Sequence, residues 1–196
     1  SCSMAEISMF ATSLYGMENV FQFSGKLKGK ISDFQCKKFY FSTGKNTFFK
    51  GNTRVRGLPD IEKTYMNIDV DNMNIDIDDI LNIKLPDNQR LQIPDIVKQL
   101  KTIGFIGNFV GYINNFKTSG NFKTPFGYFK TDVQLNPEKN RKLSFVGTVS
   151  SDNFQPGLLF MKDSIVGKTQ FTVNANGNLT DSSKIFAHLD WHIKSI

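Results

Sequence analysis

The 196-residue chain is poor in the residues that most metal and redox sites use. It contains only two cysteines, Cys2 and Cys36, two histidines and one tryptophan. The cysteines have neither the CxxC spacing nor the cysteine–histidine spacing of a zinc or dithiol site. The sequence does not decide whether they pair with each other. No stretch approaches about 18 consecutive apolar residues, which excludes a transmembrane helix.

Catalytic motifs are also absent. Val166-Gly167-Lys168-Thr169 has the end of a phosphate-binding loop, but position 162, where the first glycine should stand, is Lys162. His188 and His192 are four residues apart on an extended chain, roughly 13 Å, too far to share a metal. The chain has no Gly-x-Ser-x-Gly motif. We therefore expect no catalytic residues, no metal site and no cofactor, and we predict that the protein is not an enzyme.

Charge is unevenly distributed along the chain. The net charge is +6, and residues 26–56 hold nine Lys or Arg against one acid, Asp33, whereas residues 60–79 hold seven acids against one lysine. We interpret these as neighbouring sheet segments of complementary charge, since opposite charges across paired strands are mildly stabilising. The alternative is a basic β domain that binds single-stranded nucleic acid through residues 26–56, where aromatic residues are interleaved with lysines.

The chain is rich in phenylalanine, with 19 residues, and its apolar residues recur with a period of two. Apolar residues alternate with polar ones over residues 67–78, 129–135, 143–149, 171–173 and 187–194. The apolar phase slips by one at Asp71-Asn72, which indicates a turn or a β-bulge. Runs with one apolar and one polar face are typical of antiparallel sheet with one solvated side.

Turn signals separate the alternating runs, and Asn176-Gly177 is the clearest candidate for a tight turn. One segment has helical spacing instead, with apolar residues at Ile93, Ile96, Val97 and Leu100. Pro94 suits a first helical turn and Gly104 suits the residue just past a helix end. The spacing predicts one short helix near residues 94–103.

A short pattern recurs. Residues 29–34 (GKISDF) are similar to residues 111–116 (GYINNF), and a looser copy spans residues 147–154. This weak repetition favours an elongated sheet of similar strand pairs. Together with the way the chain begins and ends, it favours residues 1–196 being a single β-rich segment of a longer repeating-sheet protein.

The spacing of glycine, proline and apolar residues resembles that of the TamB and AsmA-like envelope proteins, particularly TamB-like translocation and assembly module proteins. The resemblance covers most of residues 20–173. It rests on Phe23 to Ile31, Asp33-Phe34, Gly44-Lys45, Thr47, Gly57 to Ile61, Leu91 to Leu100, Gly104 to Tyr112, Phe116, Gly120, Thr124 and Gly127 to Phe129. It implies a periplasmic segment of a protein anchored in the inner membrane. In such proteins a β-sheet curls into a trough with an apolar concave face. They are linked to phospholipid passage between membranes and to outer-membrane protein assembly.

We therefore predict an all-β fold, an elongated, curved antiparallel sheet that forms a taco-like trough. The expected partners are phospholipid acyl chains, neighbouring β-segments of the same long chain and an outer-membrane barrel assembly factor, but no nucleic acid. The apolar phase of the alternating runs supplies the candidate groove-lining residues: Ile68, Val70, Ile75, Ile77, Phe129, Val133, Leu135, Phe145, Phe171, Val173, Leu189 and Trp191.

The alternating pattern leaves one structural alternative open. A closed β-sandwich, serving as a scaffold or protein-interaction module, alternates in the same way, with its phenylalanines filling a dry core.

Overall fold

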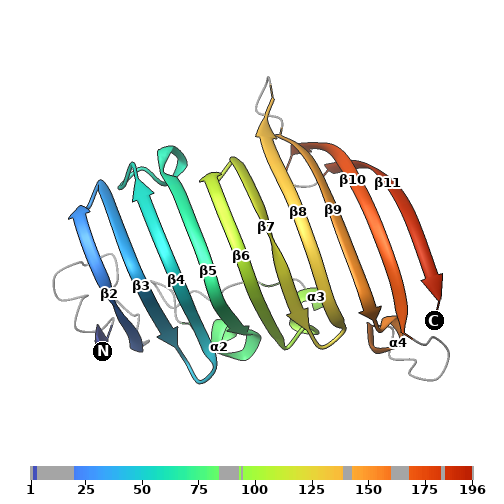
Figure 1. Cartoon of the computed structure of the whole chain (residues 1–196), viewed down its shortest axis with the longest axis horizontal. Helices are drawn as coiled ribbons and strands as arrows, with labels where there is room; N and C mark the ends of the chain where they lie inside the picture. The colour runs from blue at the N-terminus through green and yellow to red at the C-terminus, as the bar shows by residue number, and fades with distance from the viewer. Residues whose placement is uncertain are drawn as a thin grey trace.

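The protein is described here by a computed structural model covering residues 2–3, 20–83, 93, 95–138, 143–159, 168–181 and 184–195. Eleven strands form one antiparallel sheet in which the spatial order follows the chain order from β1 to β11 (Figure 1). The strands are β1 (Cys2–Ser3), β2 (Val20–Lys30), β3 (Asp33–Thr43), β4 (Thr47–Arg56), β5 (Tyr65–Asp76), β6 (Thr102–Tyr112), β7 (Asn115–Thr124), β8 (Gly127–Pro137), β9 (Leu143–Phe154), β10 (Thr169–Asp181) and β11 (Lys184–Ser195).

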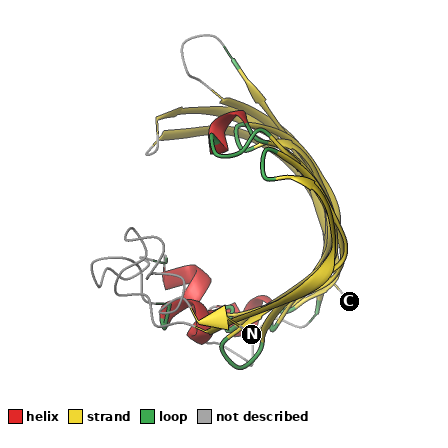
Figure 2. Ribbon diagram, turned by 90° about the vertical axis from the view of Figure 1, so that its left-hand side faces the viewer, coloured by secondary structure: helices red, strands yellow, loops and turns green. Residues whose placement is uncertain are grey.

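The sheet is long across its strands and strongly bent along them, so that its section is C-shaped (Figure 2). The predicted all-β, elongated, curved antiparallel sheet is therefore confirmed. A closed β-sandwich would need a second sheet packed on the apolar face. The described strands form one sheet only, and it is not closed.

Irregular positions help to bend the strands. The register shifts at Gly25 in β2, between Cys36 and Phe39 in β3, and around Asp71 in β5. Lys38 has φ 53°, and its backbone N–H donates to Asn52 Oδ1 at 3.1 Å. Because a bulge bends its strand and increases the local twist, these shifts help to curve the sheet. The predicted irregularity at Asp71-Asn72 is a bulge inside β5.

The repeated sequence pattern corresponds to one type of hairpin. Gly29 and Gly111 have φ 123° and 134° and pair with Phe34 and Phe116 across two-residue turns. A Cβ at either glycine would overlap the backbone of the partner strand. The first two copies therefore form turns of the same kind, one between β2 and β3 and the other between β6 and β7. The third copy begins at Gly147, inside β9.

The described connections contain four short helical turns: η2 (Ile61–Lys63), α2 (Ile77–Leu81), α3 (Asp95–Lys98) and α4 (Pro156–Leu159). The predicted helix is present as α3, but β6 already begins at Thr102. Lys101, with φ 51°, lies at the change of direction. Gly104 is a strand residue that pairs with Asn74 and Lys123 and does not end the helix. Pro94 lies outside the described residues.

The predicted tight turn at Asn176-Gly177 is wrong. Both residues lie inside β10, where Gly177 pairs with Phe145 on one side and with Ala187 on the other. Glycine within a strand marks a place where a neighbour approaches closely. The strand continues to Asp181 because it is paired along its length with both neighbours.

Asp79 of α2 holds together the strand ends at the lower edge of the sheet in Figure 1, called here the lower rim. Its carboxylate accepts hydrogen bonds from the backbone N–H groups of Lys45, Asn46 and Thr47, each at 2.8 Å. Burial alone would raise the pKa of Asp79, but these N–H donors and the side chain of Thr47 outweigh it, so the pKa is lowered. The ionised carboxylate therefore ties the β3–β4 turn to the end of β5.

Replacing Asp79 with Asn should lower the free energy of unfolding at neutral pH by about 2–3 kcal/mol, because a charged acceptor of three N–H groups is lost. The pKa of Asp79 is depressed in the folded state. Its contribution is therefore complete above the unfolded value of about 4 and is lost as the pH falls through the folded value. Urea unfolding of both proteins at pH 7 and in acid measures this.

Asp78→Asn is the matched control, since Asp78 lies in the same helical turn with an exposed side chain. We expect it to change stability by less than about 0.5 kcal/mol. A difference between Asp79→Asn and the unchanged protein that persisted in acid would contradict the electrostatic explanation.

Candidate functional site

The concave face of the sheet is lined by apolar side chains in continuous rows that run across the strands. Strand pairing is in register, so side chains that partner each other lie on one face. The first row, called here the aromatic row, follows successive partners from β2 to β8: Phe23, Phe41, Phe49, Met73, Phe105, Phe122 and Phe129. Phe171 and Ile193 are partners on the same face of β10 and β11. A stripe of large apolar side chains therefore runs along the trough from β2 to β8 and continues on β10 and β11, with Ser151, the partner of Phe171, between them on β9.

Ring contacts hold this face together. Phe105 and Phe122 have ring centroids 4.6 Å apart, and Phe109 and Phe116 on the same two strands are 4.9 Å apart. Near the C-terminal end, Phe129, Phe154 and Phe171 form a three-ring cluster with separations of 5.4–6.2 Å. Such pairs add about 0.5–1.5 kcal/mol each beyond area burial, so the rings face one another as well as the trough.

A second row, called here the glycine row, lies beside the aromatic row and contains smaller side chains. Its members from β4 to β10 are Gly51, Val70, Gly107, Gly120, Thr131, Val149 and Val173. A Cβ built at Gly107 would lie 2.7 Å from Cζ of Phe105, and one at Gly120 would lie 2.5 Å from Cε2 of the same ring. The Phe105 ring therefore occupies the space over both glycines that a larger side chain would fill.

Two further rows complete the face. One contains Cys36, Thr53, Ile68, Phe109, Thr118, Val133, Gly147, Ala175 and Leu189, and the other contains Phe34, Val55, Met66, Gly111, Phe116, Leu135, Phe145 and Gly177. Cys36 is a free thiol and is buried. No residue in these four rows carries a charge, so the part of the concave face that they cover is uncharged and mostly apolar, with threonines at positions 53, 118 and 131.

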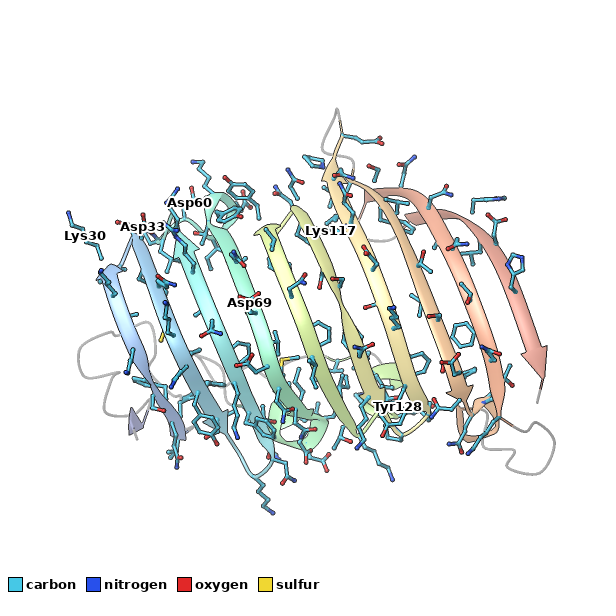
Figure 3. The ribbon with its side chains drawn as sticks, in the orientation of Figure 1. Lys30, Asp33, Asp60, Asp69, Lys117 and Tyr128 are labelled. Carbon is cyan, nitrogen blue, oxygen red and sulfur yellow. The ribbon has the colours of Figure 1, made fainter. Side chains whose placement is uncertain are left out.

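The convex face is polar. One row of register partners from β4 to β11 reads Asn52, Asp69, Asn108, Ser119, Asp132, Thr148, Asn174 and Asp190. Asp69 and Lys117 lie on this face, which is turned toward the reader in Figure 3. Thr148 Oγ1 donates to Asn174 Oδ1 at 2.8 Å, and Lys117 Nζ lies 3.8 Å from Asp132 Oδ1. The two faces of the sheet are thus chemically opposite.

Most of the predicted groove residues share the concave face. Ile68, Val70 and Ile75 lie on β5, and a further seven lie on β8 to β11: Phe129, Val133, Leu135, Phe145, Phe171, Val173 and Leu189. Trp191 lies on β11, where its backbone pairs with Val173. Its side chain is outside the described part of the structure.

Ile77 is the exception. It lies in helix α2 at the lower rim, buried to 4% exposure, and not in a strand. The strand ends at Asp76, whose Oδ1 accepts a hydrogen bond from the backbone N–H of Asp78 at 3.0 Å. Asp76 is therefore the N-cap of α2, and the acids in the first turn favour its positive end. The alternation of residues 73–77 stops one residue before Ile77.

Sequence reasoning missed the centre of the trough. Phe49, Phe105, Phe109, Phe116 and Phe122 line the concave face on β4, β6 and β7, and none of them was a predicted groove residue. The signal is present as a period of two in which phenylalanine, glycine and threonine replace the usual aliphatic residues, over residues 103–111 and 116–124.

Comparison with known proteins identifies no relative: no family model, curated protein or solved structure matches the chain. Within the described residues, no helix is long and apolar enough to cross a membrane, and no three His, Cys, Asp or Glu side chains gather where they could hold a metal ion.

The basic region lies beside the acidic one, as predicted, because β4 pairs with β5. Some of its rings share the convex face with its lysines, since Lys50 Nζ lies 5.6 Å from the ring centroid of Tyr40 and 5.5 Å from that of Phe48. Lys37 and Lys50 are on the convex face, whereas Phe39, Phe41 and Phe49 are on the concave face. A surface that stacks nucleic-acid bases needs cations and rings on one side. Tyr40, Phe48 and Lys50 meet this requirement on the convex face, so the nucleic-acid alternative stays open.

Proposed function

We propose that the chain is a non-enzymatic, hydrophobic β-trough that holds the acyl chains of phospholipids and lets them pass along its rows. The observation that carries the proposal is the uncharged concave face, which extends over ten strands and is covered by no second sheet of the described chain. Burying an acyl chain there contributes about 0.8 kcal/mol per methylene. Such a surface needs large apolar side chains and no precisely placed polar group.

The same proposal places the chain in a cell envelope. Its resemblance to TamB and AsmA-like proteins supports a periplasmic location, a full-length protein anchored in the inner membrane, and a role in phospholipid passage and outer-membrane protein assembly. An outer-membrane barrel assembly factor is then a candidate partner. Within the described strands, β11 pairs only with β10, so its outer edge can accept a neighbouring β-segment of the same long chain.

The proposal is tested by changing one face at a time. Phe145 and Val146 are adjacent in β9 and point to the concave and the convex face respectively. Phe145→Asp should abolish phospholipid that copurifies with the chain, because an acyl chain cannot pass a charge at low cost. Val146→Asp should leave the bound lipid unchanged. Native mass spectrometry of the purified proteins measures the bound lipid.

A second concave variant separates loss of lipid from loss of fold. Leu189 is 42% exposed on β11, so Leu189→Asp should fold normally, which circular dichroism can verify, and should still reduce the bound lipid several-fold. Equal amounts of lipid in the unchanged protein, Leu189→Asp and Val146→Asp would contradict the proposal. So would a well-folded, unchanged protein that binds no phospholipid when it is offered.

A further inference from the structure

One rim of the trough carries exposed isoleucines at three successive strand connections. The upper rim is defined here by the β2–β3 turn, the β4–β5 connection and the β6–β7 turn, residues 31–32, 57–64 and 113–114. Ile31, Ile61 and Ile113 lie on these connections and are 82%, 64% and 52% exposed. Turn positions usually carry small or polar residues, so an isoleucine on each of three tips needs an explanation.

The opposite rim is built differently. Two apolar residues of its described connections are buried: Phe126 of the β7–β8 turn is 7% exposed and Ile77 of α2 is 4% exposed. The β3–β4 turn consists of Gly44, Lys45 and Asn46 and is fastened by Asp79. Among the described connections, the exposed isoleucines therefore lie on one rim.

The upper rim is held in place by contacts between its tips. The backbone N–H of Gly57 donates to the carbonyl of Ser32 at 2.8 Å, and Arg56 Nε lies 3.2 Å from Asp33 Oδ2. Tyr65 and Tyr112 make an edge-on ring contact with centroids 5.6 Å apart, which joins the start of β5 to the end of β6. Connections two strands apart are about 10 Å apart, so the three isoleucines form an ordered row.

Charge indicates what the rim meets. Residues 28–33 and 54–63 hold five basic and three acidic residues. Asp33 and Asp60 are engaged by Arg56 and Lys63, the latter at 3.0 Å, and Lys30 stands beside them at the edge (Figure 3). An apolar row flanked by a net positive charge is the combination that attaches a surface to anionic lipid headgroups.

We propose that the upper rim docks on an anionic lipid surface, its three isoleucines entering the boundary between headgroups and acyl chains while Lys28 and Lys30 face the headgroups. The inference goes beyond the lipid trough, because it concerns an outer edge and holds whatever the concave face contains. It gives the trough a defined orientation, with its upper rim toward the lipid surface.

Vesicle flotation of the 196-residue chain tests the proposal. The probes are vesicles of phosphatidylcholine alone and vesicles in which about one third of the lipid is phosphatidylglycerol. We expect the unchanged protein to float with the anionic vesicles and to be released as salt is raised. Each of Ile31→Ser, Ile61→Ser and Ile113→Ser should weaken binding about tenfold, and the triple variant should lose it. Lys28→Gln with Lys30→Gln should reduce the salt dependence.

The matched control is Ile106→Ser with Val146→Ser, since these residues are 53% and 51% exposed but lie on the convex face. This variant should float like the unchanged protein. Failure of the unchanged protein to bind, or equal binding by the triple rim variant, would overturn the proposal. So would a sedimentation experiment in which the triple variant loses self-association instead of vesicle binding, because the rim would then contact a second copy.

The proposals for the rim and for the trough can be tested separately. The triple rim variant should keep its copurified phospholipid in native mass spectrometry, and Phe145→Asp should keep its vesicle binding. Loss of trough lipid in the rim variant, with the fold intact, would show that the rim is part of the trough and would also overturn the proposal.

Discussion

Gly120→Val should be among the most damaging single substitutions on the concave face, lowering the free energy of unfolding by about 3–4 kcal/mol. Gly120 pairs with Gly107 and Thr131 in the glycine row. Any Cβ at this position would overlap the carbonyl oxygen of Ile106 and would lie 2.5 Å from the Phe105 ring. The ring would have to leave the floor of the trough, and the β6–β7 pair would separate. For a chain of this size the melting temperature should fall by about 10 °C.

Thr131→Val is the matched control, because Thr131 is the register partner of Gly120 in the same row. The substitution keeps the side-chain shape and removes one hydrogen bond of 3.3 Å to the carbonyl of Gly120, so it should cost about 1 kcal/mol or less. Thermal and urea unfolding of both variants measure the difference. A Gly120→Val protein as stable as Thr131→Val would show that Phe105 is free to move and that the glycine row does not shape the floor.

The face of each strand could be predicted from the sequence because it depends on alternation alone. Ile68 and Val70, and Val133 and Leu135, keep one phase within a strand, so their shared side follows from the period. The rows could not be predicted, since they depend on the register between strands. A shift of one residue in a single pair would move an entire strand to the other face.

The errors lie where a local signal competed with pairing. Asn176-Gly177 has the composition of a tight turn, but pairing on both sides keeps it in β10. Ile77 continues the apolar phase of β5, but Asp76 ends the strand and caps helix α2, of which Ile77 is the first residue. Gly104 resembles a helix end, yet it pairs between Asn74 and Lys123. At Asn176-Gly177 and Gly104 a pairing distant in sequence outweighed the local preference, whereas at Ile77 one local signal, the Asp76 cap, outweighed another.

Phe129→Ala is expected to have the other large effect, because Phe129 joins the rings of the three-ring cluster. Its centroid lies 5.8 Å from that of Phe154 and 6.2 Å from that of Phe171. Removing a large ring from a site with partial exposure should lower the free energy of unfolding by about 2–3 kcal/mol, less than in a closed core. Tyr128→Ala, next in sequence but 54% exposed on the convex face, should cost less than about 1 kcal/mol.

The same pair of variants distinguishes rings that fill a dry core from rings that line a lipid path. Melting temperatures are measured with and without a lysophospholipid kept below its micelle concentration. A ligand that binds the folded state at about 100 times its dissociation constant adds about 2.7 kcal/mol, so the unchanged protein and Tyr128→Ala should both be stabilised. In Phe129→Ala an acyl chain can occupy the vacated space, and the lipid should restore much of the lost stability. If the lipid stabilises none of the three proteins, the phenylalanines of the concave face only pack against one another and do not line a lipid path. An open apolar trough should bind an acyl chain from solution, because binding removes apolar surface from water.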